Sequence, residues 1–255
     1  EMRRFFVEKE NIETSRVVLT DRDDVHHIAK VLRLEKGDEI SVSDGEEWEY
    51  LAEIIYISKD RCEARITDKQ RFAREPSIRV TLFQGIPKQG KMETVIQKGT
   101  ELGVETIVPV FMDRTVVSEK GNMEKKLQRW QKIAAEAAKQ CRRGIVPEVE
   151  PPVKTAEMIK RFSSYDAVIF PYENEENTTM KKVLRDLSCS WQEDQTGVRK
   201  KLAVVIGPEG GFSDSEAGDI EKSGAMPVSL GKTILRTETA GMAAVAMVMY
   251  ELEMQ

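Results

Sequence analysis

The apolar positions in the first 70 residues fall into short runs separated by polar turns, a pattern typical of β-structure. Residues 39–43 and 48–57 are such runs, and the Asp44-Gly45 turn between them predicts a hairpin. One short helix is expected between residues 23 and 32, where acidic residues come first and four apolar residues share one helical face. The four are Val25, Ile28, Val31 and Leu32. We therefore expect a compact β-domain that contains a short helix.

Beyond residue 78 the pattern changes to apolar runs that alternate with helical stripes, which predicts an α/β domain with a mostly parallel sheet. The expected strands are 78–83, 106–110, 167–170, 202–206 and 226–230, and the expected helices are 92–102, 123–143 and one from about 239. Charges and a proline between residues 71 and 77 are typical of a linker. We therefore expect two domains, over residues 1–72 and 73–255.

Composition describes an ordinary soluble protein of 255 residues, with 40% apolar residues, 33% charged residues and a net charge of -5. It excludes a uniformly basic nucleic-acid binder but leaves room for a local basic face. The longest apolar stretch, near 240–250, is shorter than the roughly 20 residues that span a bilayer. The N-terminal residues lack the apolar core of a secretory signal. We expect a cytoplasmic protein with no membrane partner.

The rare residue types limit the chemistry. Cys62, Cys141 and Cys189 lie too far apart for a disulfide framework or a zinc ribbon. His26 and His27 are the two histidines, and as neighbours their side chains point in different directions. No metal-ligand spacing occurs, so no metal is expected. Chemistry should depend on backbone groups, carboxylates and arginines.

A glycine-rich loop, Gly207-Pro208-Glu209-Gly210-Gly211, follows the expected strand 202–206 and precedes the helix-capping pattern Ser213-Asp-Ser-Glu216. In open α/β sheets such loops lie at the carboxyl ends of the strands, where ligands bind. The loop lacks the Lys-Ser/Thr of a P-loop and the spacing of a dinucleotide-binding fingerprint. It is therefore either a ligand-binding loop of another kind or a tight turn.

A second loop of the same placement runs from Leu230 to Ala240, at the end of the expected strand 226–230. Its apolar residues need burial, either against a flat ligand such as a purine or against the core. They are Leu230, Ile234 and Leu235. Arg236 and Glu238 place opposite charges beside them, which fits a functional role or a structural ion pair.

Two further segments are rich in charge. Residues 111–143 carry nine basic and four acidic residues, against 13 basic and 18 acidic in residues 1–72. The basic segment is either a phosphate-binding face or an ordinary charged helix whose last cations complement its dipole. In the expected helix 92–102, Lys98 and Glu101 are three residues apart, and we expect them to be an ordinary solvated pair.

Five motifs are spread over nearly the whole chain: Gly207 to Gly211, Leu230-Gly231 with Ile234 to Ala240, His26-His27 with Val31 to Leu34 and Gly37-Asp38, Pro87 to Gly103, and Glu136-Ala137-Ala138 with Gln140 and Pro147. Together they resemble the ribosomal RNA small subunit methyltransferase E family, a branch of the SPOUT methyltransferases. The resemblance implies a PUA-like RNA-binding β-barrel over residues 1–72 and a SPOUT domain over residues 73–255. That domain would hold a trefoil knot, a rare feature that periodicity does not reveal.

The resemblance further implies a homodimer that uses S-adenosyl-L-methionine to methylate uridine N3 in 16S rRNA of the small ribosomal subunit. The expected cofactor-binding residues are Tyr172, Ile206, Gly207, Glu209, Gly211, Leu230, Gly231, Ile234, Leu235, Arg236, Thr239 and Ala240. The expected RNA-binding residues are Arg3, Arg4, His27, Arg33, Lys88, Lys91, Arg114, Arg142 and Arg143.

For catalysis we expect Arg236 to stabilise the uracil anion that forms when N3 loses its proton. Glu238 would accept that proton or orient Arg236. Two alternatives remain at this stage: a non-catalytic RNA-binding factor of ribosome assembly, and an enzyme that acts on a nucleotide or small cofactor.

Overall fold

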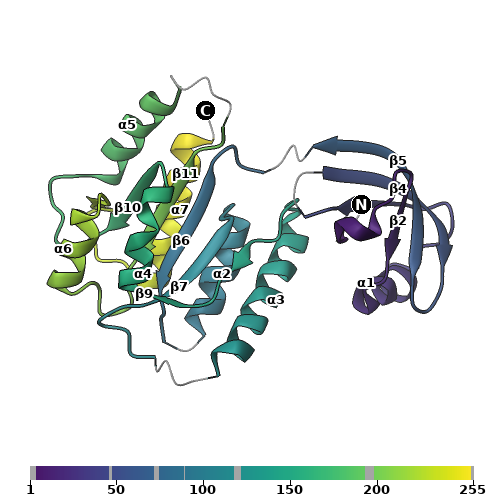
Figure 1. Cartoon of the computed structure of the whole chain (residues 1–255), viewed down its shortest axis with the longest axis horizontal. Helices are drawn as coiled ribbons and strands as arrows, with labels where there is room; N and C mark the ends of the chain where they lie inside the picture. The colour runs from purple at the N-terminus through teal and green to yellow at the C-terminus, as the bar shows by residue number, and fades with distance from the viewer. Residues whose placement is uncertain are drawn as a thin grey trace. The chain divides into compact units, whose positions relative to one another are not determined.

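A computed structural model of the chain describes residues 4–45, 48–71, 75–88, 90–117, 122–192 and 198–253 (Figure 1). The chain divides into two compact units. Unit 1 comprises Glu1–Glu75 with Ala138–Val146, and unit 2 comprises Pro76–Ala137 with Pro147–Gln255. The expected boundary between residues 72 and 73 lies outside the described residues and stays a prediction.

Unit 1 is built on a curled five-stranded sheet with the order β1-β3-β4-β5-β2 (Figure 1). Its strands are β1 (Arg4–Phe6), β2 (Arg16–Leu19), β3 (Glu39–Ser43), β4 (Trp48–Ile57) and β5 (Cys62–Arg71), with a short helix η1 (Lys9–Asn11). The expected hairpin of β3 and β4 is confirmed, and the β4–β5 pair shifts register near Leu51 and Ile54. Such irregularities bend strands, which lets the sheet curl around a core that includes Val17, Ile40 and Ile54.

The short helix of unit 1 is confirmed, but one of its expected core residues is wrong. Helix α1 (Arg22–His26) is followed directly by the π-helix η2 (His27–Val31). Val25 and Ile28 are buried as expected, whereas the Val31 side chain is 57% exposed. The wider π turn explains the difference, because a residue three positions after Ile28 no longer lies on the same face.

Unit 2 is built on a seven-stranded sheet with the order β12-β10-β11-β6-β7-β8, and β9 pairs separately with β7. All of these pairings are parallel, as the alternation of strands and helices predicts. The strands are β6 (Arg79–Gly85), β7 (Thr106–Phe111), β8 (Glu148–Val149), β9 (Val153–Lys154), β10 (Ala167–Pro171), β11 (Lys201–Ile206) and β12 (Met226–Val228).

Helices cover both faces of this sheet (Figure 1). They are α2 (Lys91–Glu101), α3 (Met123–Cys141), α4 (Thr155–Lys160), η3 (Phe162–Ser164), α5 (Met180–Gln192), α6 (Asp214–Lys222) and α7 (Thr237–Leu252). Helix α7 packs on β6 and β11 and contacts α2 and α5. The other face buries Phe83 and Val205 with side chains of α4, η3 and α6. Sequence periodicity predicted α2, α3 and α7 but not α4 or α5.

None of the helices in the described part of the chain is both long enough and apolar enough to cross a bilayer.

Candidate functional site

Three loops of unit 2 meet at one edge of the sheet. They follow β10, β11 and β12, which are adjacent and parallel, so their carboxyl ends share that edge. The loops are 172–179, 207–213 and 229–236. The Tyr172 amide donates to the Val228 carbonyl at 3.0 Å, and the Ser229 amide donates to the Thr178 carbonyl at 2.8 Å. The first and third loops are therefore joined by backbone hydrogen bonds.

The glycine-rich loop after β11 approaches its neighbours closely. A Cβ atom on Gly85 at the end of β6 would lie 2.5 Å from the Pro208 nitrogen. Gly211 has a φ of 67°, and a Cβ there would overlap the carboxylate of Glu173. Both positions need glycine, one for close packing of backbone and the other for its left-handed conformation as well. The loop is thus more than a connecting turn, since its backbone forms part of the packed edge.

A buried hydrogen-bond chain joins this loop to α7. The Thr237 hydroxyl donates to the Gly207 carbonyl at 2.6 Å and accepts from the Gln84 side-chain amide at 2.8 Å. Gln84 is fully buried and also donates to the Gly85 carbonyl at 2.9 Å. The sequence patterns above assign no role to Gln84, although a glutamine at the end of an otherwise apolar run is a signal for such a role. These hydrogen bonds fix the start of α7 against β6 and β11.

A charged bridge joins the same two segments. The Lys91 Nζ atom lies 3.2 Å from Glu209 Oε1 and 3.2 Å from Glu238 Oε2. The Lys88 amide also donates to Glu209 Oε1, at 2.9 Å. Partial burial opposes ionisation, but this amide and Lys91 lower the pKa of Glu209. Partial burial also disfavours the charged form of Lys91, but Glu238 and Glu209 outweigh it and raise the pKa of the lysine. Glu209 and Lys91 are therefore held in their charged forms.

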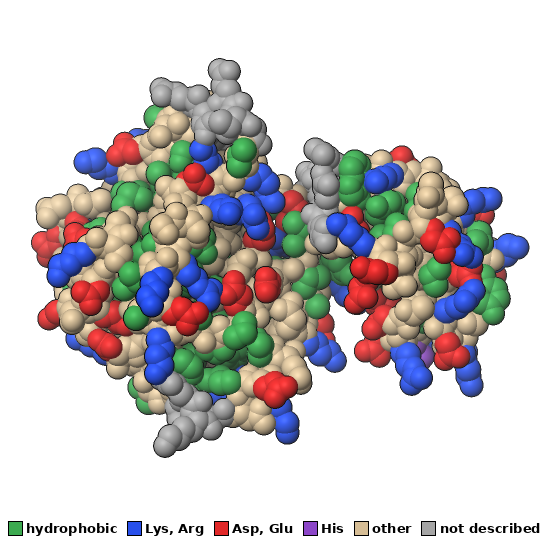
Figure 2. Space-filling view, viewed as in Figure 1, with side chains coloured by type: hydrophobic (Ala, Val, Ile, Leu, Met, Phe, Trp, Pro, Cys, Tyr) green, Lys and Arg blue, Asp and Glu red, His purple; other side chains and the backbone are tan. Residues whose placement is uncertain are grey.

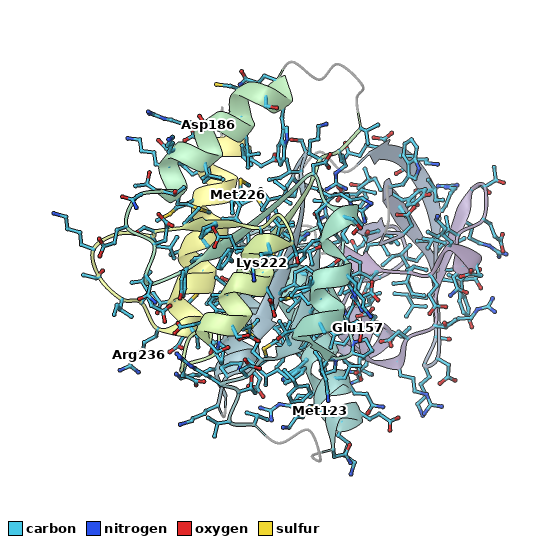
Figure 3. The ribbon with its side chains drawn as sticks, turned by 60° about the vertical axis from the view of Figure 1, so that its left-hand side comes forward. Met123, Glu157, Asp186, Lys222, Met226 and Arg236 are labelled. Carbon is cyan, nitrogen blue, oxygen red and sulfur yellow. The ribbon has the colours of Figure 1, made fainter. Side chains whose placement is uncertain are left out.

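Arg236 lies at the outer end of the third loop, immediately before α7 (Figure 3). Its side chain is exposed, and within the described residues its guanidinium has no hydrogen bond or ion pair. Glu238 pairs with Lys91, so the ion pair between Arg236 and Glu238 that the sequence left open is not observed. Arg236 is thus a cation available to a ligand or substrate.

The apolar residues of the third loop are only partly covered. Ile234 is 88% exposed, while Leu230 and Leu235 are half-buried. Tyr172 is half-buried too, and its ring packs edge-on against Phe212 with centroids 6.3 Å apart. An adenosyl ligand with an amino-acid chain needs apolar surfaces and a few backbone polar groups. This edge offers both, so the residues present fit S-adenosylmethionine.

The expected cofactor-binding residues all belong to these three loops and the residues that adjoin them. At the start of α7, Thr239 is exposed and Ala240 is half-buried. Gly231 has a φ of 137°, and its amide is bonded to the Ser229 hydroxyl at 3.3 Å. Ile206 is buried as the last residue of β11.

The segment after β7 supports the glycine-rich loop from outside. The Arg114 guanidinium donates to the Gly210 carbonyl at 2.8 Å. The Ser213 hydroxyl accepts from the Glu216 amide at 3.1 Å, which confirms the predicted cap, and it donates to Asp113 at 2.5 Å. The expected RNA-binding residue Arg114 therefore contacts the loop as well as solvent.

Within the described residues, the Glu216 carboxylate makes no hydrogen bond to the backbone amide of the cap residue Ser213, unlike the acidic residue of a complete capping box. It is buried and accepts from the Thr155 hydroxyl at 2.5 Å and from the Asp113 amide at 3.3 Å. Burial raises the pKa of Glu216, although these donors oppose the shift. Glu216 is thus a structural carboxyl group beneath the site.

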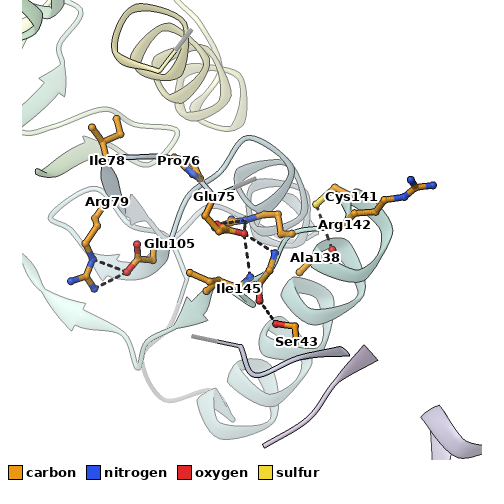
Figure 4. A network of polar contacts seen from close by, with 12 residues as sticks. Ser43, Glu75, Pro76, Ile78, Arg79, Glu105, Ala138, Cys141, Arg142 and Ile145 are labelled. Atoms are coloured by element: carbon orange, nitrogen blue, oxygen red, sulfur yellow. Dashed lines mark hydrogen bonds and ion pairs between the residues drawn. The ribbon is translucent and has the colours of Figure 1, made fainter. Parts of the chain in front are cut away.

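In unit 1, two of the expected RNA-binding arginines are buried in ion pairs. Arg143 pairs with Glu75 at 2.8 Å, and both side chains are 7% exposed. Glu75 also accepts from the amides of Gly144 and Ile145 at 2.8 and 3.2 Å (Figure 4). Arg4 is buried against Glu49. These placements favour structural roles for Arg4 and Arg143 over contact with RNA.

The other expected RNA-binding residues differ in exposure. Arg33 and Arg142 are exposed and have positive φ values of 54° and 62°. His27 is half-buried, with its ring 6.5 Å from that of Phe5. In unit 2, Lys88 is exposed. Arg3 lies outside the described residues. On the face shown in Figure 2, basic and acidic side chains are intermixed and form no continuous positive area.

Among the described residues, no group of three or more His, Cys, Asp and Glu side chains is placed to hold a metal ion.

Comparison with known proteins gives consistent results for both parts of the chain. Residues 73–249 match the RNA methyltransferase domain family, and residues 19–67 match the RNA methyltransferase PUA domain. The chain is 32% identical to the ribosomal RNA small subunit methyltransferase E of Bacillus subtilis, over 99% of this chain and 98% of that protein. It is 31% identical to the protein of the same name from Buchnera aphidicola of Acyrthosiphon pisum, over 95% and 90%.

Two similar solved structures contain the cofactor. The ribosomal RNA small subunit methyltransferase E of Neisseria gonorrhoeae, bound to S-adenosyl methionine, has a TM-score of 0.79 and 30% identity. A putative methyltransferase of Legionella pneumophila, in complex with the same cofactor, has a TM-score of 0.79 and 29% identity. Each comparison covers 98% of both chains.

Proposed function

The chain belongs to the ribosomal RNA small subunit methyltransferase E family and is an S-adenosylmethionine-dependent rRNA methyltransferase, and we propose that it methylates N3 of a uridine in 16S rRNA. The observation that carries this proposal is the edge of unit 2 where three loops meet. Glycine backbone, apolar side chains and an exposed arginine converge there. These are the groups that an adenosyl donor and an anionic base require.

The chain's own residues would hold the donor. Tyr172, Leu230 and Leu235 supply apolar surface, and the backbone near Gly207 and Gly211 supplies polar groups without side chains in the way. Ile234 would become covered when a ligand lies against it. The donor supplies an electrophilic methyl group carried by a positive sulfur, and the transfer needs no covalent enzyme intermediate.

Arg236 is the residue we propose for catalysis. Uridine N3 must lose its proton before it accepts a methyl group, and a cation beside the uracil carbonyl oxygens stabilises the resulting anion. The guanidinium of Arg236 is suited to that role, because it is exposed and has no ion pair with any described residue. Glu238 stays a candidate for the proton acceptor, now in an ion pair with Lys91.

Unit 1, as the PUA-like part of the chain, would bind RNA through local contacts. The residues proposed for RNA contact are His27, Arg33 and Arg142 of unit 1 and Lys88 and Arg114 of unit 2, with Arg3 outside the described residues. Lys91, Arg4 and Arg143 were also expected to bind RNA but pair with carboxylates of the chain, so they are not proposed for this role. Removal of any one cation that binds a phosphate should reduce the salt dependence of RNA binding. Since its substrate is ribosomal RNA of the small subunit, we place the protein in the cytoplasm.

We also propose a homodimer, in which α7 is part of the interface. This helix exposes Ala246, Met247 and Tyr250 on one side, and Tyr250 is 69% exposed. Two-fold association would cover the same apolar stripe on both copies. Light scattering of the Tyr250→Glu variant should then report the mass of a monomer, and an unchanged mass would contradict this part of the proposal.

Transfer of a labelled methyl group to small-subunit RNA, followed by mapping of the modified base, tests the function. The proposal requires label on N3 of one uridine. RNA binding without transfer would favour a non-catalytic assembly factor. Transfer to a nucleotide or another small molecule, with none to RNA, would favour the alternative enzyme.

A further inference from the structure

Lys91 occupies a position that local helix energetics disfavours. It is the first residue of α2, and a cation at a helix N-terminus opposes the helix dipole. The preceding residue, Gly90, provides no side-chain cap. Two carboxylates compensate for this placement, and both come from segments far away in the sequence, the glycine-rich loop and the first turn of α7.

The bridge is partly screened from water. The exposed fractions of the Lys91, Glu209 and Glu238 side chains are 29%, 25% and 17%. A neighbouring pair on the same helix is different, because Lys98 and Glu101 belong to one helix and their contact at 2.9 Å joins no other element. Lys91 therefore connects three segments, whereas Lys98 connects residues of a single turn.

Two links join the glycine-rich loop region to the start of α7, and they differ in how easily they can break. The Thr237–Gly207 hydrogen bond is backed by the buried Gln84. The Lys91 bridge is adjacent to this hydrogen bond, because Glu238 directly follows Thr237, but water reaches the bridge. Segments with partly exposed contacts open at lower free energy than buried ones. Loops that enclose a ligand must open for exchange, so the charged link is the one suited to open first.

We infer that Lys91 is a positioning residue that clasps the glycine-rich loop to α7 and thereby sets how long S-adenosylmethionine and its demethylated product stay bound. This inference rests on the proposed cofactor site. In the closed arrangement Lys91 holds Glu209 and Glu238 together. When the bridge opens, the glycine-rich loop and the first turn of α7 separate on the side that water reaches. The buried Thr237–Gly207 hydrogen bond continues to hold their inner ends together.

The test uses three variants of the full chain: Lys91→Met, Lys91→Arg as the conservative rescue, and Lys98→Met as the matched control on the same helix. Calorimetry and stopped-flow fluorescence measure binding and dissociation of S-adenosylhomocysteine, so no turnover is needed. We expect Lys91→Met to speed dissociation about tenfold, the effect of two partly exposed ion pairs. Lys91→Arg should restore most of the slow dissociation of the parent protein. The dissociation rate of Lys98→Met should stay within about twofold of the parent rate.

A coupling measurement distinguishes a clasp from general destabilisation. Glu209→Gln and Glu238→Gln should show non-additive effects on the dissociation rate in the parent, and the effects should become additive in the Lys91→Met background. If Lys91→Met does not fold, as judged by circular dichroism, Glu238→Gln alone must speed dissociation. Unchanged dissociation in the folded Lys91→Met variant, or in Glu238→Gln, would overturn the inference. Failure of the parent to bind the product would instead contradict the proposed cofactor site.

Discussion

The sequence suggests a functional role both for the basic cluster at the end of α3 and for the loop edge of unit 2. In the structure, the loop edge assembles as expected, whereas part of the basic cluster is buried in an ion pair. At the end of α3, Arg143 turns inward to Glu75, a residue 68 positions away. At the loop edge, the parallel strand order brings the predicted loops together. Charge content predicts no direction for a side chain, whereas parallel topology fixes which strand ends meet.

Glu75→Gln should produce the largest effect, because it leaves the buried guanidinium of Arg143 without a counter-charge. Breaking such a pair costs roughly 3–5 kcal/mol in the free energy of unfolding. Urea denaturation measures the loss, with Glu101→Gln, from the more exposed Lys98 pair, as a control that should cost about 0.5 kcal/mol or less. A loss below about 1 kcal/mol for Glu75→Gln would show that this pair is not a structural centre of unit 1.

Arg236→Ala should reduce kcat by about a hundredfold, which corresponds to about 2.7 kcal/mol of transition-state stabilisation. The side chain is exposed and makes no hydrogen bond or ion pair with any described residue, so folding should change little. Steady-state methylation assays measure the effect, and Arg236→Lys should recover part of the rate. Full activity of Arg236→Ala would remove this residue from the mechanism.

Thr237→Val should destabilise unit 2 by about 1–3 kcal/mol, because the Gly207 carbonyl and the Gln84 amide lose their shared partner in a buried place. Thermal unfolding measures this loss. Thr239→Val, at an exposed position in the same turn, is the control and should change stability by less than about 0.5 kcal/mol. Equal effects of the two substitutions would mean that the buried chain contributes nothing specific.

Substitution of Glu216 should have a smaller effect, on how the free energy of unfolding depends on pH. Burial raises the pKa of its carboxyl group above 4.5, so the folded state binds this proton more tightly than the unfolded state. The contribution of Glu216 to stability is therefore complete below pH 4.5 and falls as the pH rises through the folded pKa. Unfolding measured across this pH range should show a shallower decline in Glu216→Gln. Parallel profiles for the variant and the parent would contradict the assignment.

Particular residues show what sequence could and could not predict. The longer strands of unit 2 and the glycine-rich loops are predictable because apolar runs and glycines act locally, whereas the two-residue strands β8 and β9 carry too short a pattern. The partners of Lys91 and Gln84 are not predictable, because they lie on segments distant in the sequence; Gln84 and Thr237 are 153 positions apart. Val31 was misplaced because periodicity assumes a regular α-helix, and η2 is a π-helix. The expected knot stays a prediction, since strand order does not describe how the chain end is threaded.

Hydrogen exchange with and without S-adenosylhomocysteine reports on the loops at the sheet edge themselves, where we propose that the cofactor binds. We expect slower exchange of backbone amides in segments 172–179, 207–213 and 229–240, with little change in unit 1. Protection confined to other segments, or none at a saturating concentration of the ligand, would contradict the proposed cofactor site.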